Sequence, residues 1–444
     1  MDDDKLLFTI PKDLLMIITS YNPVLIFNLP ESFYTKYDWY ALIKNNFSLI
    51  YSKRDTTNND MMKTYIWNCI KDDLNCEISA GPSNIFIKKN TGLLMSCGRN
   101  DYGQLGNKSQ LNYVKSMGQP YFEQVKLPNP KDCISQIICS GWRTIIRLNN
   151  GKLLNIGCDL TFEKDSCDRY KIDQFKEIEN IPNNISQVVC GLTHVIILLT
   201  DGTLMACGSN GCGEIGCGEE SWIKKFTKID NIPKNIVEIV CGQSHTIIRL
   251  SDGTLMSTGS NYCGQLGHND TKSRNKFEEI KNIPKNIVQI ACGEDNTIIR
   301  LTDGTLMGCG DNSAGQLGID GIVWALKFEE IKNIPKNIVE IACGNEYSMI
   351  RLTNGILMSC GSNMDGALGH GDNKRRNIFT KIEDVSKNII QFICRGGYSM
   401  IRLTDDTIMC CGNNEYDQFG NGSHENENKF KKVFNINEIV ENIK

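Results

Sequence analysis

The chain has 444 residues, and its 48 lysines and arginines nearly balance its 52 aspartates and glutamates, which leaves a formal net charge of -4. This balance excludes the strongly basic surface that binding to a nucleic-acid backbone needs, so no nucleic-acid partner is expected. The start of the chain is acidic and no apolar run approaches the roughly 18 residues of a spanning helix, so neither a secretory signal nor a membrane association is expected. We therefore expect an intracellular protein, cytoplasmic or nuclear, that is not secreted.

Residues 1–70 lack the repeat pattern of the rest of the chain and are expected to form a small α-helical region. Leu14, Leu15 and Ile18 recur with helical spacing after Pro11, which predicts an amphipathic helix. The segment resembles the opening of an F-box, and this resemblance implies that Leu14, Leu15 and Ile18 dock a ubiquitin-ligase adaptor. The alternative is a small helical cap packed on the domain that follows.

Residues 71–444 consist of tandem units of about 51 residues, marked by a recurring phenylalanine and a recurring turn glycine. Asp-Gly pairs such as Asp252-Gly253 lie between two alternating apolar runs, which is a strong hairpin signal because both turn residues need positive φ. An Ile/Val-rich run before the hairpin and a Phe-x-x-Ile run after it bring each unit to about four short strands. The markers are Phe122, Phe175, Phe226, Phe277, Phe328, Phe379 and Phe430, and Gly92, Gly151, Gly202, Gly253, Gly304 and Gly355, with Asp406 in the seventh turn.

This pattern predicts an all-β fold, a seven-bladed β-propeller, for residues 71–444. Radial blades pack their sheets on each other and leave only short edges, whereas a solenoid of this length needs atypical capping repeats that the sequence lacks. A copy of the first strand opens the series at Glu77-Ile78, and another follows the last phenylalanine at Ile439-Val440. We therefore expect residues 435–443 to complete a blade begun near the start of the repeats, so that strand pairing closes the ring.

Many of the twenty cysteines fall on the same lattice of about 51 residues. One cysteine per unit indicates one core position per blade, because a free thiol packs as a small hydrophobic group and equivalent positions in neighbouring blades lie too far apart for a disulfide. No Cys-x-x-Cys pair or Cys/His cluster has zinc-ligand spacing, so neither a metal nor a cofactor is expected. The series is Cys139, Cys190, Cys241, Cys292, Cys343 and Cys394.

Three segments are close copies of one sequence: CGRNDYGQLG at 97–106, TGSNYCGQLG at 258–267 and CGDNSAGQLG at 309–318. They resemble the repeats of the regulator of chromosome condensation family, and the resemblance extends over about residues 72–444. It implies a seven-bladed propeller whose founding members promote guanine nucleotide exchange on a small GTPase and whose other members are interaction or sensing domains. Exchange in that family uses an inserted wedge, whereas five consecutive units here keep the period without an insertion.

The loops that follow each repeated Cys-Gly vary more than the strands and, in the family that the chain resembles, lie on one face of the disc. Variable loops on a rigid frame commonly carry recognition, and Tyr, Trp and Arg are enriched at binding hot spots. The alternative is drift in solvent-exposed turns. His194 and His245 hold the histidine position of the repeat and are expected to be structural hydrogen-bonding groups. The predicted partner-binding residues are Trp142, Arg143, Gln243, Glu294, Asp295, Asn345, Glu346, Tyr347 and Tyr398.

A basic residue lies four positions before almost every turn glycine, which predicts one basic side chain per blade. Such a ring could attract anions, because arginine presents a planar donor fork suited to carboxylate or phosphate. In the alternative interpretation each side chain pairs with a neighbouring carboxylate, such as Glu238 or Glu340, or with a carbonyl between blades. The series is Lys88, Arg147, Arg249, Arg300, Arg351 and Arg402, with Leu198 as the exception.

No phosphate-binding loop, nucleophile elbow or metalloprotease helix is present in the sequence, so no catalytic residue is assigned and an enzyme is not expected. The expected function is a non-catalytic protein-protein interaction scaffold, with a substrate receptor of a ubiquitin ligase as its specific form. The alternative is a guanine nucleotide exchange factor for a small GTPase. The expected partners are accordingly a ubiquitin-ligase adaptor or a small GTPase.

Overall fold

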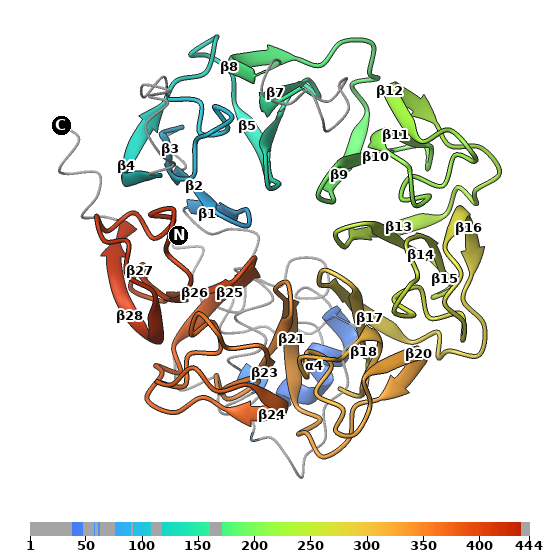
Figure 1. Ribbon diagram of the computed structural model, residues 1–444, viewed down its shortest axis with the longest axis vertical. Helices are drawn as coiled ribbons and strands as arrows, with labels where there is room; N and C mark the ends of the chain where they lie inside the picture. Colours follow the sequence, from blue (N-terminus) through green and yellow to red (C-terminus); the bar gives the residue numbers. More distant parts are fainter. Residues whose placement is uncertain are drawn as a thin grey trace, which may run out of the picture.

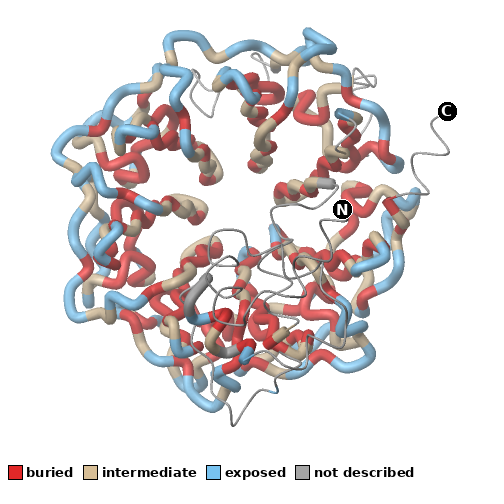
Figure 2. The backbone as a smooth tube through the Cα atoms, turned by 180° about the vertical axis from the view of Figure 1, so that it is seen from behind, coloured by how far each residue is buried: buried red, intermediate tan, exposed pale blue. Residues whose placement is uncertain are grey.

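The computed structural model describes residues 38–47, 57, 61–62, 76–89, 92–107, 118–159 and 171–436. Seven four-stranded antiparallel sheets stand radially around a common axis, and each sheet uses four consecutive strands (Figure 1). Buried residues lie within and between the sheets, while exposed residues gather on the outer rim (Figure 2). The predicted seven-bladed β-propeller is therefore confirmed.

We number the blades 1 to 7 along the chain, and the first strand of each blade lies nearest the axis (Figure 1). The strands of blades 1 to 3 are β1 Cys76–Ala80, β2 Asn84–Lys89, β3 Leu94–Gly98, β4 Gln119–Val125; β5 Ile134–Cys139, β6 Arg143–Leu148, β7 Leu153–Cys158, β8 Lys171–Glu177; β9 Ile185–Cys190, β10 His194–Leu199, β11 Leu204–Ser209, β12 Trp222–Lys228. Those of blades 4 to 7 are β13 Ile236–Cys241, β14 His245–Leu250, β15 Leu255–Gly259, β16 Arg274–Glu279; β17 Ile287–Cys292, β18 Asn296–Leu301, β19 Leu306–Asp311, β20 Trp324–Glu330; β21 Ile338–Cys343, β22 Tyr347–Leu352, β23 Leu357–Gly361, β24 Arg376–Lys381; β25 Ile389–Arg395, β26 Tyr398–Leu403, β27 Thr407–Gly412, β28 Glu427–Asn435.

The helical region predicted for residues 1–70 is described only in part. Helix α4 spans Trp39–Phe47, and the Asp38 carboxylate accepts a hydrogen bond from the backbone N–H of Ala41 at 3.3 Å, as an N-cap does. Leu14, Leu15 and Ile18 lie outside the described residues. So does the stretch 63–75, in which the predicted boundary at residue 70 falls.

The ring closes by packing of blade 7 on blade 1, and the prediction that residues 435–443 complete a blade by strand pairing was wrong. Blade 1 is a full sheet made of β1 to β4, and blade 7 is a full sheet made of β25 to β28, so neither sheet needs a strand from the other end of the chain. One hydrophobic cluster joins the two blades, with the Phe122 and Phe434 rings 4.8 Å apart at their centroids in an edge-to-face arrangement. Residues 437–444 lie outside the described residues.

The seventh hairpin turn shows why the Asp-Gly pattern could lose its glycine. Asp406 takes the place of the turn glycine and adopts a positive φ of 64°, a conformation that aspartate tolerates better than most residues. Its carboxylate accepts a hydrogen bond from Arg402 Nε at 2.9 Å. The hairpin therefore forms as in the other blades, and Asp406 also neutralises the basic side chain of blade 7.

The ring of basic side chains joins blades and does not form a free anion-binding circle, so the pairing interpretation is confirmed. Arg249 Nε lies 2.8 Å from Glu238, and Arg351 lies 3.0 Å from Glu340. Arg147 donates to the carbonyl of Ile185, the first residue of the next inner strand, at 3.0 Å. In blades 1, 2, 5 and 6 the basic side chain donates to the first carbonyl of the next inner strand. It thereby satisfies a polar group at a sheet edge that has no further strand to pair with.

Side chains on the inner strands complete these edges from blade to blade. Gln187 accepts a hydrogen bond from the N–H of Ile239 at 3.2 Å and donates to the carbonyl of the same residue at 3.0 Å. Gln289 forms the same pair of hydrogen bonds with Ile341, at 3.1 Å and 3.0 Å. Blade 3 has this glutamine but leucine at the basic position, Leu198. The frame therefore accepts either an arginine–glutamate pair or a leucine–glutamine pair.

Because the propeller accepts either pair, the effect of Arg351→Leu on stability can be predicted. The single substitution leaves Glu340 as a mostly buried carboxylate without its guanidinium, and we expect the free energy of unfolding to fall by about 3 kcal/mol. The double variant R351L/E340Q recreates the Leu198–Gln187 pair of blade 3 and should recover more than half of that loss. Urea denaturation of the two variants measures both values. Equal stability of the single and double variants would contradict the role given to this pair.

The repeated cysteines lie in the core, as predicted. Burial raises the pKa of the Cys139 and Cys241 thiols to about 12, so these thiols stay protonated at neutral pH. All the cysteines that the structure describes are free thiols. The repeated cysteines act as small apolar groups within the blades.

Candidate functional site

The first and third loops of every blade lie on the same face of the disc, because the strands of an antiparallel sheet alternate in direction. We call this the loop face, and the opposite one, which carries the turns between second and third strands, the hairpin face. Hydrogen bonds tie together the first loops of blades 3 to 7. The N–H groups of Leu192, Gln243, Glu294 and Asn345 each donate to the carbonyl of the residue 51 positions later, over 3.0 to 3.3 Å. The loop face therefore has a fixed inner rim.

Three of the predicted partner-binding residues are not on this surface. Arg143, Tyr347 and Tyr398 are 2%, 2% and 0% exposed, so their assignment to an exposed binding loop was wrong. Each is the first residue of a second strand, the position that His194 and His245 hold in blades 3 and 4. The side chain at this position turns inward between neighbouring blades.

In blades 3 and 4 the histidine position links the blade to the next one by a hydrogen bond. His194 Nε2 lies 3.2 Å from Thr246 Oγ1, and His245 Nε2 lies 3.0 Å from the hydroxyl of Thr297. Thr246 Oγ1 donates its own proton to the carbonyl of Glu214 at 2.8 Å, so Nε2 of His194 carries a proton and donates it to Thr246. Burial lowers the pKa of His194 to about 3 and that of His245 to about 4, so both imidazoles are neutral at neutral pH. The prediction that both are structural hydrogen-bonding groups is confirmed.

Tyrosine and arginine fill the same position in other blades. Tyr398 Oη donates to the carbonyl of Gly81 in blade 1 at 2.9 Å, and the Tyr347 hydroxyl donates to the carbonyl of Tyr398. In blade 3 the position of the hydroxyl partners Thr246 and Thr297 is held by Val195, which has no hydroxyl group to offer to Arg143. The buried Nε of Arg143 has no hydrogen-bond partner in the described part of the chain. The two tyrosines join neighbouring blades by hydrogen bonds. All three side chains are buried, so none of them is a partner contact.

Trp142 belongs to a cluster that crosses three blades on the loop face. Its ring centroid lies 6.3 Å from that of Tyr102 in blade 1. The Arg99 guanidinium lies 6.0 Å from the Tyr102 ring and 4.6 Å from the ring of Tyr416 in blade 7, within cation–π range. All four side chains are half-buried. We call Arg99, Tyr102, Trp142 and Tyr416 the seam cluster.

Sequence reasoning missed three of these four residues. Arg99, Tyr102 and Tyr416 lie in the segment between the repeated Cys-Gly and Gly-Gln-Leu-Gly, the third loop, which was used only to recognise the repeat. Three of its four positions vary from blade to blade, and only the asparagine at the second position is kept. That variation could have indicated that the third loops also contribute to a binding surface.

The other surface candidates gather on blades 4 to 6. Gln243, Glu294 and Asp295 are half-buried, while Asn345 and Glu346 are exposed. Burial raises the pKa of Glu294, and the nearby carboxylates of Asp295 and Glu346 raise it further. Burial also raises the pKa of Asp295, with a second contribution from Asp311. We call Glu294, Asp295, Asp311 and Glu346 the acidic rim.

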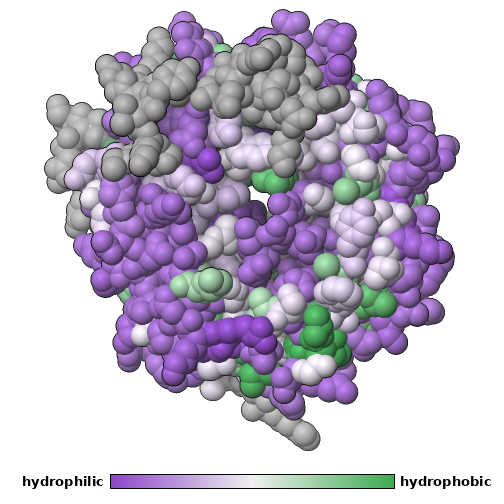
Figure 3. Space-filling view, viewed as in Figure 1, coloured by the Kyte–Doolittle hydropathy of each residue, from purple (hydrophilic) through white to green (hydrophobic). Residues whose placement is uncertain are grey.

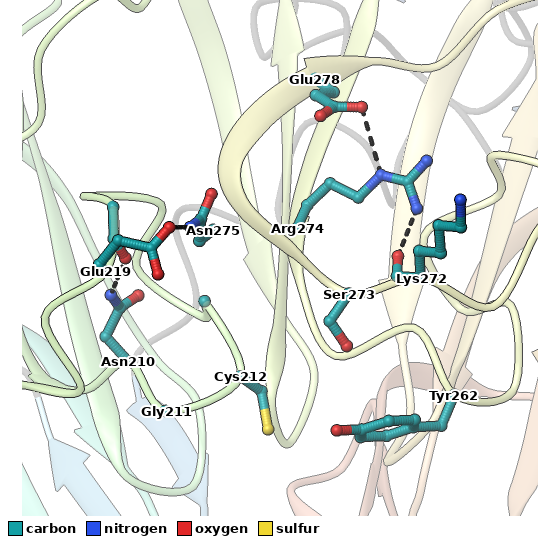
Figure 4. Close-up of a pocket in the computed structure, with 12 residues that line it drawn as sticks. Asn210, Gly211, Cys212, Glu219, Tyr262, Lys272, Ser273, Arg274, Asn275 and Glu278 are labelled. Atoms are coloured by element: carbon teal, nitrogen blue, oxygen red, sulfur yellow. Dashed lines mark hydrogen bonds and ion pairs between the residues drawn. The ribbon is translucent and has the colours of Figure 1, made fainter.

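A pocket of about 480 Å³ opens between the third loops of blades 3 and 4 (Figure 4). Arg274 is held by Asp270 at 2.6 Å and by Glu278 at 3.2 Å, so its charge is compensated within its own blade. Tyr262, which is 67% exposed, reaches across the opening toward Cys212. The lining combines positively charged, negatively charged and neutral polar side chains, so it suits a polar segment of a partner. Its residues are Asn210, Gly211, Cys212, Gly213, Gly218, Glu219, Tyr262, Lys272, Ser273, Arg274, Asn275 and Glu278.

Within the described ranges, no three His, Cys, Asp or Glu side chains are grouped so that they could hold a metal ion. Nor do those ranges contain a helix with the length and apolar character needed to cross a bilayer.

The family model of the RCC1-like domain matches residues 52–401, which is most of the chain. The chain belongs to the RCC1-like domain family. The X-linked retinitis pigmentosa GTPase regulator of Homo sapiens is 29% identical over 324 residues, which cover 60% of this chain and 31% of that protein. The human E3 ubiquitin-protein ligase HERC2 is 28% identical over 246 residues, 52% of this chain and 5% of HERC2. This RCC1-like chain thus spans less than a third of the length of either relative.

Solved structures agree with the RCC1-like fold. Prp20p of Saccharomyces cerevisiae, whose structure was reported with its binding to Gsp1p and histones, superposes with a TM-score of 0.65 at 22% identity. That match covers 74% of this chain and 83% of Prp20p. Human WBSCR16 superposes with a TM-score of 0.66 at 17% identity, over 77% of this chain and 93% of the other. At these identities the likeness establishes the RCC1-like fold alone.

Proposed function

We propose that this chain is a non-catalytic scaffold that binds a protein partner on its loop face. The observation that carries the proposal is the seam cluster. Arginine, tyrosine and tryptophan from three blades meet there in a half-buried, ordered group, and these are the residue types that contribute most at protein interfaces. Side-chain hydrogen bonds join blade 7 to blade 1 and blade 1 to blade 2, so a partner meets a preorganised surface with little ordering cost.

The specific form that we propose is a substrate receptor of a ubiquitin ligase that acts inside the cell. The propeller would hold the substrate, and the segment with Leu14, Leu15 and Ile18 would dock the ligase adaptor. Support comes from the F-box-like spacing of these residues and from the similarity to HERC2, which is a ubiquitin ligase. The free thiols of the described cysteines suit a reducing compartment.

Affinity capture with the full chain tests the binding face. We expect R99A/W142A to lose the partner that the parent chain retains, because the variant removes two of the four seam-cluster side chains. The matched control K285A/K336A changes two exposed lysines on the hairpin face and should retain the partner. Loss of the partner with the control, and retention with R99A/W142A, would place the binding site on the other face.

The identity of the captured proteins distinguishes a ubiquitin-ligase receptor from a guanine nucleotide exchange factor. Adaptor subunits that disappear with L14S/L15S/I18S, while the substrate stays bound, would support the receptor. A small GTPase held most tightly without nucleotide, by every variant altered only in residues 14–18, would instead identify an exchange factor.

A further inference from the structure

The third loop of blade 5 exposes two adjacent large apolar side chains, whereas the third loops of blades 4 and 6 expose one each, Tyr262 and Met364. Val323 is 61% exposed and Trp324 is 53% exposed, and Ile322 beside them is half-buried. At the same three positions blade 4 has Thr271, Lys272 and Ser273, and blade 6 has Asn373, Lys374 and Arg375. The strongest green area in Figure 3 lies at the lower right, over the part of the disc where Figure 1 places β20. Since blades 4 and 6 fold with polar residues here, the frame does not require these apolar side chains.

Burial within the chain therefore does not explain this loop, which we call the apolar loop (Ile322, Val323 and Trp324). An exposed group of large apolar side chains on an otherwise polar surface marks a site of association. Tryptophan contributes most to such sites because it buries a large area and loses little conformational freedom.

The acidic rim continues directly from the apolar loop toward the axis. Asp311 is the cross-strand partner of Trp324 where β19 pairs with β20. The N–H of Asp311 donates to the carbonyl of Asp295 at 2.8 Å, which ties the end of β19 to the first loop of the same blade. Glu294 precedes Asp295, and Glu346 extends the rim into blade 6.

The negative charge of the acidic rim is not balanced by a basic side chain among the described residues. In the described part of the chain no lysine or arginine forms an ion pair with any of its four carboxylates. Asp311 instead accepts hydrogen bonds from Ser313 and Gln316, and Asp295 accepts one from Gln265 at 2.7 Å. The carboxylates repel one another, so a positive charge brought in by a partner would relieve that repulsion.

We propose that the apolar loop and the acidic rim together form a docking site for a protein segment that presents lysine or arginine beside large apolar side chains. The apolar residues of the segment pack on Val323 and Trp324, and its basic residue lies over the rim. The inference rests on the proposed use of the loop face and adds the chemical class of the partner. It places a second contact region on the side of the ring away from the seam cluster.

Selection of random peptides of about twelve residues, displayed on phage, against the full chain tests the proposal. We expect the selected peptides to combine a lysine or arginine with large apolar residues. Their affinity should fall at least about tenfold for I322T/V323K/W324S, which imports the residues of blade 4 and so keeps a sequence that this fold accepts. Charge removal in E294Q/E346Q should weaken binding several-fold, and so should added salt. M364A, which alters another exposed apolar residue of a third loop, should bind as the parent does.

The outcomes separate this inference from the proposed function. Peptides that bind the triple variant as well as the parent but not R99A/W142A would overturn the docking site and leave the loop face as the binding surface. Selection of acidic peptides, or of none, would also overturn the site. If sedimentation shows that the parent self-associates and the triple variant does not, a second copy of the chain is the occupant and the proposal is wrong.

Discussion

Replacing Tyr398 by alanine should lower the free energy of unfolding by about 3 to 5 kcal/mol, the range for a fully buried aromatic side chain. Tyr398 is 0% exposed and lies in the cluster that joins blade 7 to blade 1. Its ring packs 6.0 Å from that of Phe419, and its hydroxyl donates to the carbonyl of Gly81 at 2.9 Å. The substitution therefore opens a cavity where the two ends of the propeller meet. Denaturation in guanidinium chloride measures the loss.

Tyr398→Phe is the matched control for this prediction. It keeps the ring and removes only the hydroxyl group, so we expect a loss of about 1 to 2 kcal/mol from the unpaired carbonyl of Gly81. A near-normal stability of the alanine variant, together with loss of partner binding, would show that Tyr398 acts at the surface. That result would contradict its placement in the core.

Acidification from pH 7 to pH 5 should destabilise the propeller through its buried histidines. An unfolded histidine has a pKa near 6.5. Burial lowers the pKa of His194 to about 3 and that of His245 to about 4, so the folded state binds fewer protons than the unfolded state below pH 6.5. The stability that each neutral histidine contributes is complete above pH 6.5 and is lost as the pH falls, by about 2 kcal/mol per histidine at pH 5.

The variant H194N/H245N isolates this effect. Blade 5 already has asparagine, Asn296, at the histidine position, so the substitution uses a residue that the frame accepts. Urea denaturation at pH 7 and at pH 5 should show that the pH-dependent loss is smaller in the variant by about 4 kcal/mol. An unchanged pH dependence would mean that these histidines are not held neutral between the blades.

The fold was predictable because the repeat fixes local structure seven times over. Each Asp-Gly hairpin, Phe marker and core cysteine supports the same register, so even the substitution of Asp406 for glycine did not obscure the seventh turn. Closure of the ring was not predictable in the same way. A strand-like sequence such as Ile439-Val440 shows that a segment can pair, but only the spatial arrangement shows that blades 1 and 7 are already complete sheets.

The site was predicted less well for two physical reasons. Arg143, Tyr347 and Tyr398 were assigned to variable loops, although they lie on the same 51-residue lattice as His194 and His245 and so share their inward direction. Position in the repeat, and not residue type, decides burial there. The seam cluster draws on blades 1, 2 and 7, which are distant in sequence and meet only when the ring closes.

Hydrogen–deuterium exchange of the full chain, alone and with its captured partner, tests most directly the claim that this propeller binds proteins on its loop face. The account predicts slower exchange on binding in the first and third loops, above all near Arg99, Trp142 and the apolar loop, with the hairpin turns at Gly202, Gly253 and Gly304 unchanged. Slower exchange confined to those hairpin turns would contradict it.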